Sequence, residues 1–311
     1  MARVSPPTQR VTALLDAVCA APRHPHSLAD LAKSTGVSKA TGLGILNELC
    51  ASGWLSRDAE TKTYRPGPRL LAVGAAAEES YAPVDAARPA LHQLTVDLDA
   101  PATVSVRTAH QALIVARHGP HPNRTPSLRA GLHTPLIAPG ALVFFAWSDD
   151  TTLDRWLTDS PLHSERVDRE QVAGIVKAAR RDGYLVERLS DLDPALFALL
   201  AELGTAPIPA QLSDVIRRTL DPSGMAQYLI DRVDRRRRYD VGYVAAPVFD
   251  RSGELAFLVS VLIMEAGVAG AELERVATTL LGATAEMTAA IGGVNPWRTL
   301  SRGTARRAAA R

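Results

Sequence analysis

The apolar residues near the start of the chain recur at the spacing of an α-helix. Between Val11 and Val18 they fall every three or four positions, which predicts an amphipathic helix that Thr8 caps and Pro22 ends. A helix with a single apolar face is stable only when that face packs against other elements, so we expect partners nearby in the sequence.

Two further helices follow, with a sharp turn between them. Ser27 can cap the first, in a Ser-Leu-Ala-Asp sequence that resembles a capping box with aspartate in place of glutamate. Gly36 breaks that helix, because the tight turn needs a positive φ that glycine adopts readily. Ser38 can cap the next helix, which has apolar residues on one face and which Gly53 closes.

Two short extended runs come next, at residues 54–57 and 62–64, and the polar residues between them predict a β-hairpin. Helix, helix, turn, helix and hairpin within 70 residues is the order of elements in a winged helix-turn-helix domain. Another helix is expected from Pro68. Pro83 interrupts the helical stretch that follows, so we expect a domain boundary near residue 80.

Short strands and helices alternate in the rest of the chain, which predicts an α+β domain. A hairpin is expected from residues 241–249 and 255–263, because the connection from Asp250 to Gly253 suits a type I turn. A long final helix has an apolar face from Leu273 to Ile291. The other expected elements are strands at 103–108, 113–118 and 184–187 and helices at 137–147 and 169–181.

The composition is that of an ordinary globular protein of two domains, with 311 residues and 46% apolar residues. No run of 18 apolar residues predicts a membrane span, and the start of the chain lacks the apolar stretch of a signal peptide. Cys19 and Cys50 lie on apolar helix faces, which favours reduced thiols and leaves a bridge between them as the alternative. We therefore expect a cytoplasmic protein.

The net charge of +2 does not by itself indicate a nucleic-acid partner, but the distribution of cations is uneven. Arg57, Lys62, Arg65 and Arg69 fall in and just after the expected hairpin. Residues 298–311 contain five arginines and no acid, which is typical of a solvated tail and leaves a phosphate-contacting tail as the alternative.

A winged helix-turn-helix domain places its recognition helix in the major groove of DNA and rests its wing on the phosphates. The third predicted helix is the recognition helix here, and its first turns offer short donors and one cation. For each residue alone, an ordinary solvated side chain is the alternative; as a set on this scaffold they predict DNA contact. The expected DNA-binding residues are Ser27, Ser38, Lys39, Thr41, Asn47, Arg57, Lys62 and Arg65.

Enzyme chemistry finds little support in the sequence. There is no HExxH, Cys-x-x-Cys, Gly-x-Ser-x-Gly or glycine-rich phosphate loop. His118 and His121 enclose a Gly-Pro turn but have no matching cysteine or carboxylate spacing for a metal. We expect no enzymatic activity, no metal and no cofactor.

The sequence resembles the IclR family of bacterial transcription regulators over roughly residues 8–292. The segments that carry the resemblance are SLADLA at 27–32, GVSKAT at 36–41, GWLSRD at 53–58, YRPGPRL at 64–70 and VAAPVFD at 244–250. The resemblance implies a GAF-like effector-binding domain with a mainly antiparallel sheet flanked by helices. It also implies a DNA operator and a small-molecule effector as partners, a linker helix that dimerises, and often a dimer of dimers.

The resemblance further implies a set of effector-binding residues. Ser260 also stands out without it, as the one polar side chain on the apolar strand predicted at 255–263; a serine bonded to neighbouring backbone is the alternative. By position in the family, the segment at 138–140 lies near a helix N-terminus, which can hold an anion. The expected residues are Ala138, Pro139, Gly140, Glu187, Tyr243, Ser260 and Leu262.

The chain departs from the family pattern at both sites. Gly42, Leu43 and Gly44 stand where bulky or cationic residues are usual, so we expect fewer side chains at the bases, a close backbone approach, or an undemanding operator. In the second domain, Tyr243 stands in place of a cysteine that is common in the family, and the segment around 139–140 is altered. Residues 190–240 look inserted. The arginine run at 235–238 is typical of a solvated helix end, and binding of an acidic partner or ligand is the alternative.

These observations predict a regulator with four parts. They are a winged helix-turn-helix domain at 1–67, a helical linker at 68–82, an effector-binding domain at 83–295 with an insertion at about 190–240, and a basic tail at 296–311. The alternative function is a sensor or protein-interaction module whose degenerate helix-turn-helix does not read DNA specifically.

Overall fold

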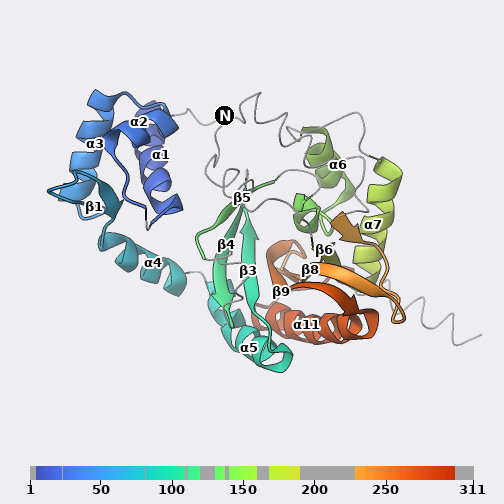
Figure 1. Cartoon of the computed structure of the whole chain (residues 1–311). Helices are drawn as coiled ribbons and strands as arrows, with labels where there is room; N and C mark the ends of the chain where they lie inside the picture. Colours follow the sequence, from blue (N-terminus) through green and yellow to red (C-terminus); the bar gives the residue numbers. More distant parts are fainter. Residues whose placement is uncertain are drawn as a thin grey trace, which may run out of the picture. The chain divides into compact units, whose positions relative to one another are not determined.

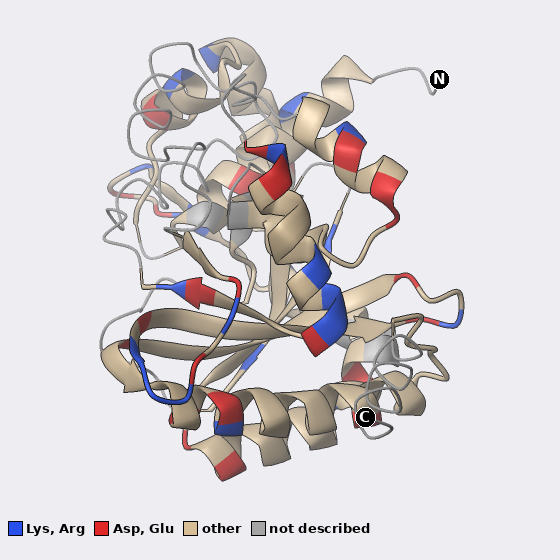
Figure 2. Cartoon of the chain, turned by 90° about the vertical axis from the view of Figure 1, so that its right-hand side faces the viewer, with Lys and Arg blue, Asp and Glu red and all other residues tan. Residues whose placement is uncertain are grey.

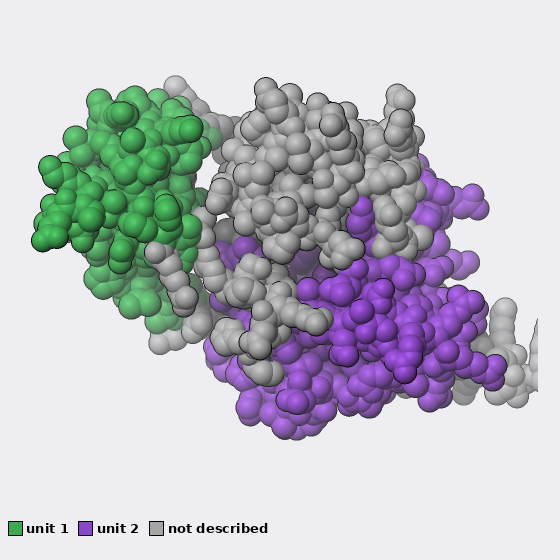
Figure 3. All heavy atoms as spheres, in the orientation of Figure 1, with its two compact units in different colours: residues 1–82 green, residues 83–311 purple. Residues whose placement is uncertain are grey.

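The computed structural model describes residues 5–22, 24–80, 82–108, 111–119, 130–136, 140–159, 168–189 and 228–297. The chain divides into two compact units, residues 1–82 and residues 83–311, which we call unit 1 and unit 2 (Figure 3). In the described part of the chain, no helix is both long and apolar enough to cross a lipid bilayer.

Unit 1 is the expected helix-turn-helix with a two-stranded wing, and a small apolar core holds it together (Figure 1). The core is formed by Leu14, Val18, Leu31, Val37, Leu46, Leu49, Leu55 and Tyr64, all nearly inaccessible to solvent. The elements are α1 (Pro6–Ala20), α2 (Leu28–Thr35), α3 (Lys39–Ala51), β1 (Leu55–Arg57), β2 (Tyr64–Pro66) and α4 (Arg69–Ser80).

The local signals in unit 1 act largely as expected. The hydroxyl oxygens of Ser27 and Ser38 accept the backbone N–H groups of Asp30 and Thr41, each at 3.2 Å, and so cap α2 and α3. Gly36 has a φ of 70° directly after α2. The start of α1 was expected at Thr8 but lies at Pro6, since proline is accepted in a first helical turn where its missing N–H costs nothing.

Unit 2 contains an antiparallel sheet with the strand order β5-β4-β3-β9-β8-β6-β7 (Figure 1). The strands are β3 (Ala102–Arg107), β4 (Gln111–His118), β5 (His133–Pro135), β6 (Leu185–Arg188), β7 (Leu229–Ile230), β8 (Arg238–Phe249) and β9 (Leu255–Ala269). The helices are α5 (Ala82–Leu98), α6 (Asp150–Asp159), α7 (Arg169–Asp182), α11 (Gly270–Ala290) and the 3₁₀ helix η1 (Gly140–Phe144).

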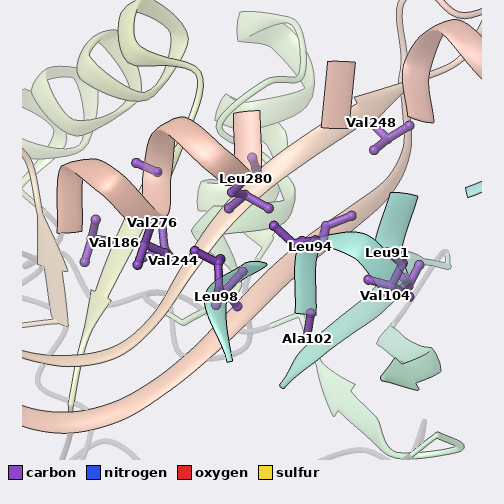
Figure 4. Close-up of a cluster of buried hydrophobic side chains, with 14 of the residues drawn as sticks. Leu91, Leu94, Leu98, Ala102, Val104, Val186, Val244, Val248, Val276 and Leu280 are labelled. Carbon is purple, nitrogen blue, oxygen red and sulfur yellow. The ribbon is translucent and has the colours of Figure 1, made fainter. Parts of the chain in front are cut away.

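A separate core covers each face of this sheet. On one face, Leu91 and Leu94 of α5 and Val276 and Leu280 of α11 pack on valines such as Val244 of the central strands (Figure 4). On the other face, η1, the turn after it, α6 and α7 supply an aromatic-rich cluster that includes Phe145, Trp147 and Trp156. The predicted α+β class with a sheet flanked by helices is confirmed.

Three expectations in unit 2 need correction. The helix expected at 137–147 is a 3₁₀ helix over Gly140–Phe144 followed by a turn, and residues 137–139 lie outside the described residues. The strand expected to begin at 241 begins at Arg238, and the strand expected to end at 263 continues to Ala269. The sequence pattern did not reveal these extensions, because irregular pairing and a φ of 51° at Met264 break the alternation that marks a strand. The arginine run is not a helix end: residues 235–237 form a turn and Arg238 begins β8.

Cys19 and Cys50 are not joined by a disulfide, and both are only partly buried. The inserted stretch was expected at about 190–240; residues 190–227 of it lie outside the described residues, as does His121. The described residues contain no group of three potential metal ligands. His118 instead shares a hydrogen bond with His92 of α5, with 2.9 Å between the Nε2 and Nδ1 atoms.

Candidate functional site

The third helix of unit 1, α3, has one face in the core and one face in solvent. Leu46 and Leu49 are buried, whereas Lys39, Leu43 and Asn47 are exposed. These three exposed residues are four apart in sequence, so they form a single stripe along α3. Ser38 orients the start of the stripe, because its hydroxyl donates to the Thr41 hydroxyl at 2.9 Å while it caps the helix.

The two glycines of α3 differ in their surroundings, which corrects the expectation that both strip the outer face. Gly42 is buried, and a Cβ there would lie 3.5 Å from Leu28 and 3.8 Å from Val37. It therefore fits α3 against the preceding helix and turn. Gly44 is exposed, and a Cβ there would meet nothing within 4 Å. Only Gly44 leaves the outer face bare.

The wing loop is ordered by one carboxylate. Oδ1 of Asp58 accepts hydrogen bonds from the backbone N–H of Thr61 at 2.7 Å and of Glu60 at 3.0 Å, and these bonds help hold the pKa of Asp58 below its usual value. The loop leaves Lys62 at a φ of 56°, so β2 begins at Tyr64 and not at Lys62 as expected.

The expected DNA-binding residues all lie on the surface of unit 1 or at its edge. Ser38, Lys39 and Thr41 stand together at the start of α3, with Asn47 two turns later. Arg57, Lys62 and Arg65 are exposed on the wing, where the Arg57 guanidinium lies 5.7 Å from the Tyr64 ring centre. Ser27 caps α2 and donates to Asp30 at 2.6 Å, so its hydroxyl is largely engaged within the helix start.

A residue outside that set, Arg69, joins the wing to the end of α3. Its guanidinium donates to the Ser52 carbonyl at 3.3 Å and lies 5.2 Å from the centre of the Trp54 ring. The backbone beside it is tightly crossed: the Gly67 N–H donates to the Trp54 carbonyl at 2.8 Å, and a Cβ on Gly67 would fall 2.3 Å from the Gly53 oxygen. The positive charge of Arg69 could be seen in the sequence, but its contacts with Ser52 and Trp54 could not.

In unit 2, four of the expected effector residues lie on the adjacent strands β6, β8 and β9. Strand pairing sets Glu187 opposite Tyr243, Tyr243 opposite Leu262, and Ala245 opposite Ser260. Because side chains alternate along a strand, Glu187, Tyr243, Ser260 and Leu262 share the sheet face that η1, α6 and α7 cover. Ala138 and Pro139 lie outside the described residues, and Gly140 begins η1.

The same strand pairs add two polar residues that the sequence did not single out. Thr103 of β3 lies opposite Ser260 on one side and opposite Arg117 of β4 on the other. Thr103 and Ser260 are buried, at 3% and 7% exposure. A row of polar side chains thus crosses the middle of the sheet, next to the Glu187–Tyr243 pair. Only the strand register reveals this row.

Glu187 and Tyr243 form a partly buried polar pair. The Tyr243 hydroxyl donates a hydrogen bond to Oε2 of Glu187. Burial raises the pKa of Glu187 from 4.5 to about 7, and the bond from Tyr243 opposes that rise. Burial and the adjacent Glu187 carboxylate both raise the pKa of Tyr243 well above its usual value, so the hydroxyl keeps its proton.

Two arginines donate hydrogen bonds to the turn after η1. Arg107 donates to the Phe144 carbonyl and the Ser148 hydroxyl, both at 3.1 Å. Arg180 lies in the last turn of α7 and donates to the carbonyls of Ala146 at 2.9 Å and Ser148 at 2.6 Å. Figure 2 shows the basic residues of the chain in blue, including those at the end of α7. These bonds fix the carbonyl-rich end of η1 as a turn, which is why it does not continue as the expected α-helix.

Residues 7–59 match the family model of the IclR helix-turn-helix domain. A search of the curated proteins found no significant match. Among solved structures, an IclR transcriptional regulator from Alicyclobacillus acidocaldarius is 19% identical with a TM-score of 0.67, over 93% of this chain and 100% of that one.

Two other solved structures have the same fold over similar lengths. HmgR of Pseudomonas aeruginosa is 20% identical with a TM-score of 0.57, over 89% of this chain and 95% of that one. An IclR homolog from Microbacterium hydrocarbonoxydans, complexed with 4-hydroxybenzoate, is 15% identical with a TM-score of 0.60, over 92% and 98% of the two chains. Residues 7–59 thus match the IclR helix-turn-helix domain, and most of the chain has the fold seen in these solved IclR-family regulators.

Proposed function

We propose that the chain is a DNA-binding transcription regulator, which inserts α3 into the major groove and rests its wing on the phosphates. The observation that carries this proposal is the outer surface of unit 1. The stripe of Lys39, Leu43 and Asn47 on α3 is solvent-exposed, and the wing adds three exposed cations. Anionic DNA is the partner that such a surface fits.

The test is fluorescence anisotropy of the full chain on the DNA upstream of its own gene, across a range of salt concentrations. Replacing Arg57 and Arg65 together by alanine removes two exposed wing cations. If both contact phosphate, the slope of log affinity against log salt falls by about 1.8. Arg251→Ala, which removes an exposed cation of the β8–β9 turn, is the matched control and should leave the slope unchanged. Failure of the wild-type chain to bind DNA at low salt contradicts the proposal.

The alternative of a degenerate helix-turn-helix loses part of its basis in the structure. It rested on the idea that both Gly42 and Gly44 leave the DNA-facing side of α3 without side chains. Gly42, however, is buried against α2 and is not on that side of the helix. One exposed glycine is compatible with a reading helix, because it allows the helix to approach the groove closely.

For unit 2 we propose a small-molecule site on the sheet face that carries Glu187, Tyr243, Ser260 and Leu262, with Thr103 beside them. A row of buried polar side chains on a covered sheet face supports this site. The relative from Microbacterium hydrocarbonoxydans is described in complex with 4-hydroxybenzoate, so that compound is a suitable first probe. Binding should raise the melting temperature of the wild-type chain and shift its affinity for DNA, and Ser260→Ala should weaken both effects.

We further propose that the regulator acts as a homodimer or a dimer of dimers in the cytoplasm. Leu71 and Val73 of α4 are exposed at 79% and 42%, and an exposed apolar surface on a linker helix favours self-association. Sedimentation equilibrium of wild type and Leu71→Lys measures the assembly, and the variant should shift toward the monomer. A wild-type chain that remains monomeric at micromolar concentration contradicts this part of the proposal.

A further inference from the structure

The outer face of α3 carries an apolar side chain that the core of unit 1 does not use. Leu43 is 38% exposed, and within the described part of residues 5–66 it is the one large apolar residue on the exposed surface. Leu46 and Leu49, three and six residues later, complete the core from the adjoining side of the helix. Leu43 lies at the edge of this buried side and is not one of the core residues, so its side chain is available to a partner.

The neighbours of Leu43 indicate what kind of surface covers it. Lys39 lies one turn before it and Asn47 one turn after it, so a cation, an apolar group and an amide follow one another along a single stripe. Ala40 and Gly44 flank the stripe, and a Cβ on Gly44 would meet nothing within 4 Å. The small residues let a partner approach the backbone, and the cation favours an anionic partner.

The major groove of DNA matches this order of groups. Thymine presents the one apolar group in that groove, its C5 methyl, while adenine presents N7 and N6 to a bidentate asparagine. Leu43 and Asn47 are separated by about 6 Å along the helix axis, close to the rise of two base pairs. Glu48 follows Asn47 in the third turn and accepts a hydrogen bond from the Ser52 hydroxyl at 3.4 Å, so its carboxylate makes Asn47 the last residue of α3 that we expect to contact a base.

We propose that Leu43 recognises a thymine through its C5 methyl, that Asn47 recognises an adenine about two base pairs away, and that Ala40 and Gly44 permit the close approach. This inference rests on the proposed function and deepens it, because it names the bases that a helix poor in long polar side chains selects. The operator half-site is then expected to contain a thymine and an adenine at that spacing.

The experiment begins with selection of binding sites by the full chain from randomised duplex DNA. Each thymine of the selected half-site is then replaced by deoxyuridine, which lacks only the C5 methyl. Loss of one methyl contact should weaken wild-type binding about fourfold at one position. Leu43→Ala should bind the thymine site more weakly than wild type and should not distinguish deoxyuridine from thymidine at that position.

A parallel series tests Asn47 with 7-deazaadenine, which lacks the N7 acceptor. The analogue should weaken wild-type binding by about fivefold or more at one adenine and leave Asn47→Ala unaffected. Gly42→Ala is the control, because its new methyl faces α2, and it should keep the sensitivity of wild type to both analogues.

Three results overturn the inference. The first is that deoxyuridine leaves the DNA affinity of the wild-type chain unchanged at every position, a result that needs no variant. The second is that deoxyuridine weakens binding by Leu43→Ala as much as binding by the wild-type chain. The third is that 7-deazaadenine weakens binding by the wild-type chain and by Asn47→Ala equally. All of these presuppose that the wild-type chain binds DNA, so they leave the proposed function standing. If the wild-type chain binds no DNA, the proposed function fails and the base assignments fail with it.

Discussion

The hydroxyl of Tyr243 donates a hydrogen bond to the carboxylate of Glu187, and the two residues are direct cross-strand partners on β8 and β6. The pair lies on the covered face of the sheet, where burial brings the pKa of Glu187 to about 7. A carboxyl group in such a place titrates near neutral pH. Its ionisation therefore influences the stability of unit 2 under ordinary conditions.

Glu187→Gln should reduce the dependence of stability on pH. Because the pKa of Glu187 is raised on folding, its contribution is fully present below pH 4.5 and is lost as the pH rises from 4.5 through about 7. Above pH 7 the loss amounts to about 3 kcal/mol. Glutamine keeps an acceptor for Tyr243 but has no charge to bury. In urea titrations, the difference in unfolding free energy between variant and wild type should thus shift in favour of the variant between pH 5 and pH 8, and a constant difference contradicts the assignment.

Gly42→Ala and Gly44→Ala should have similar effects on stability and different effects on DNA binding. Each removes a glycine from α3, which favours the helix by about 1 kcal/mol, and neither new methyl meets an atom closer than 3.5 Å. The methyl at 42 faces α2, whereas the methyl at 44 stands on the outer face. Thermal unfolding should show both variants stabilised, while anisotropy should show weaker binding to the selected site for Gly44→Ala alone. Equal DNA affinities of the two variants would show that the outer face is not the reading face.

Gly67→Ala should destabilise unit 1 by about 2–3 kcal/mol. The added Cβ would fall 2.3 Å from the Gly53 oxygen and 2.7 Å from the carbonyl carbon of Trp54, which are backbone atoms that cannot rotate away. Gly74→Ala in α4 is the control, because its Cβ would meet nothing within 4 Å. Hydrogen exchange of amides in the wing and α3 reports the effect in unit 1 directly, and equal protection in the two variants contradicts the prediction.

Arg180→Met should destabilise unit 2 by about 3 kcal/mol, because it leaves the buried carbonyls of Ala146 and Ser148 without their charged donor. The guanidinium also lies 4.3 Å from the Trp297 ring centre, so the end of the described chain loses a packing partner. Arg181→Met removes a solvent-exposed cation from the adjacent position, where it pairs with the neighbouring Asp182, and should change the unfolding free energy little. If urea titrations give the two variants equal stability, the turn does not depend on Arg180.

The features that could be predicted from sequence are those decided within one turn of chain. Ser27 and Ser38 accept hydrogen bonds from residues three positions later, and Gly36 turns the chain directly after α2. The residue types at these positions were therefore enough to predict the caps and the turn. The start of α1 was wrong because two acceptable starts, Pro6 and Thr8, lie within the same turn. The turn that ends the 3₁₀ helix η1 was missed because the side chains that hold it, Arg107 and Arg180, are distant in sequence.

The candidate sites show the same division. The cations of the wing could be named from the sequence, but the inward position of Gly42 depends on how α3 packs on α2. Glu187 and Tyr243 were each expected by resemblance, yet their hydrogen bond joins residues 56 positions apart. Thr103 carried no signal of its own; its place beside Ser260 follows from the register of β3 and β9.

The tight crossing at Gly67 has a mechanical consequence. The Arg69 N–H donates to the Gly53 carbonyl at 3.1 Å, and the Arg69 side chain lies on Trp54, so the first turn of α4 is fastened to the last turn of α3 and to the wing. Only a short, hydrogen-bonded stretch of backbone separates α4 from this crossing. A rotation of α4 is therefore expected to be transmitted to α3.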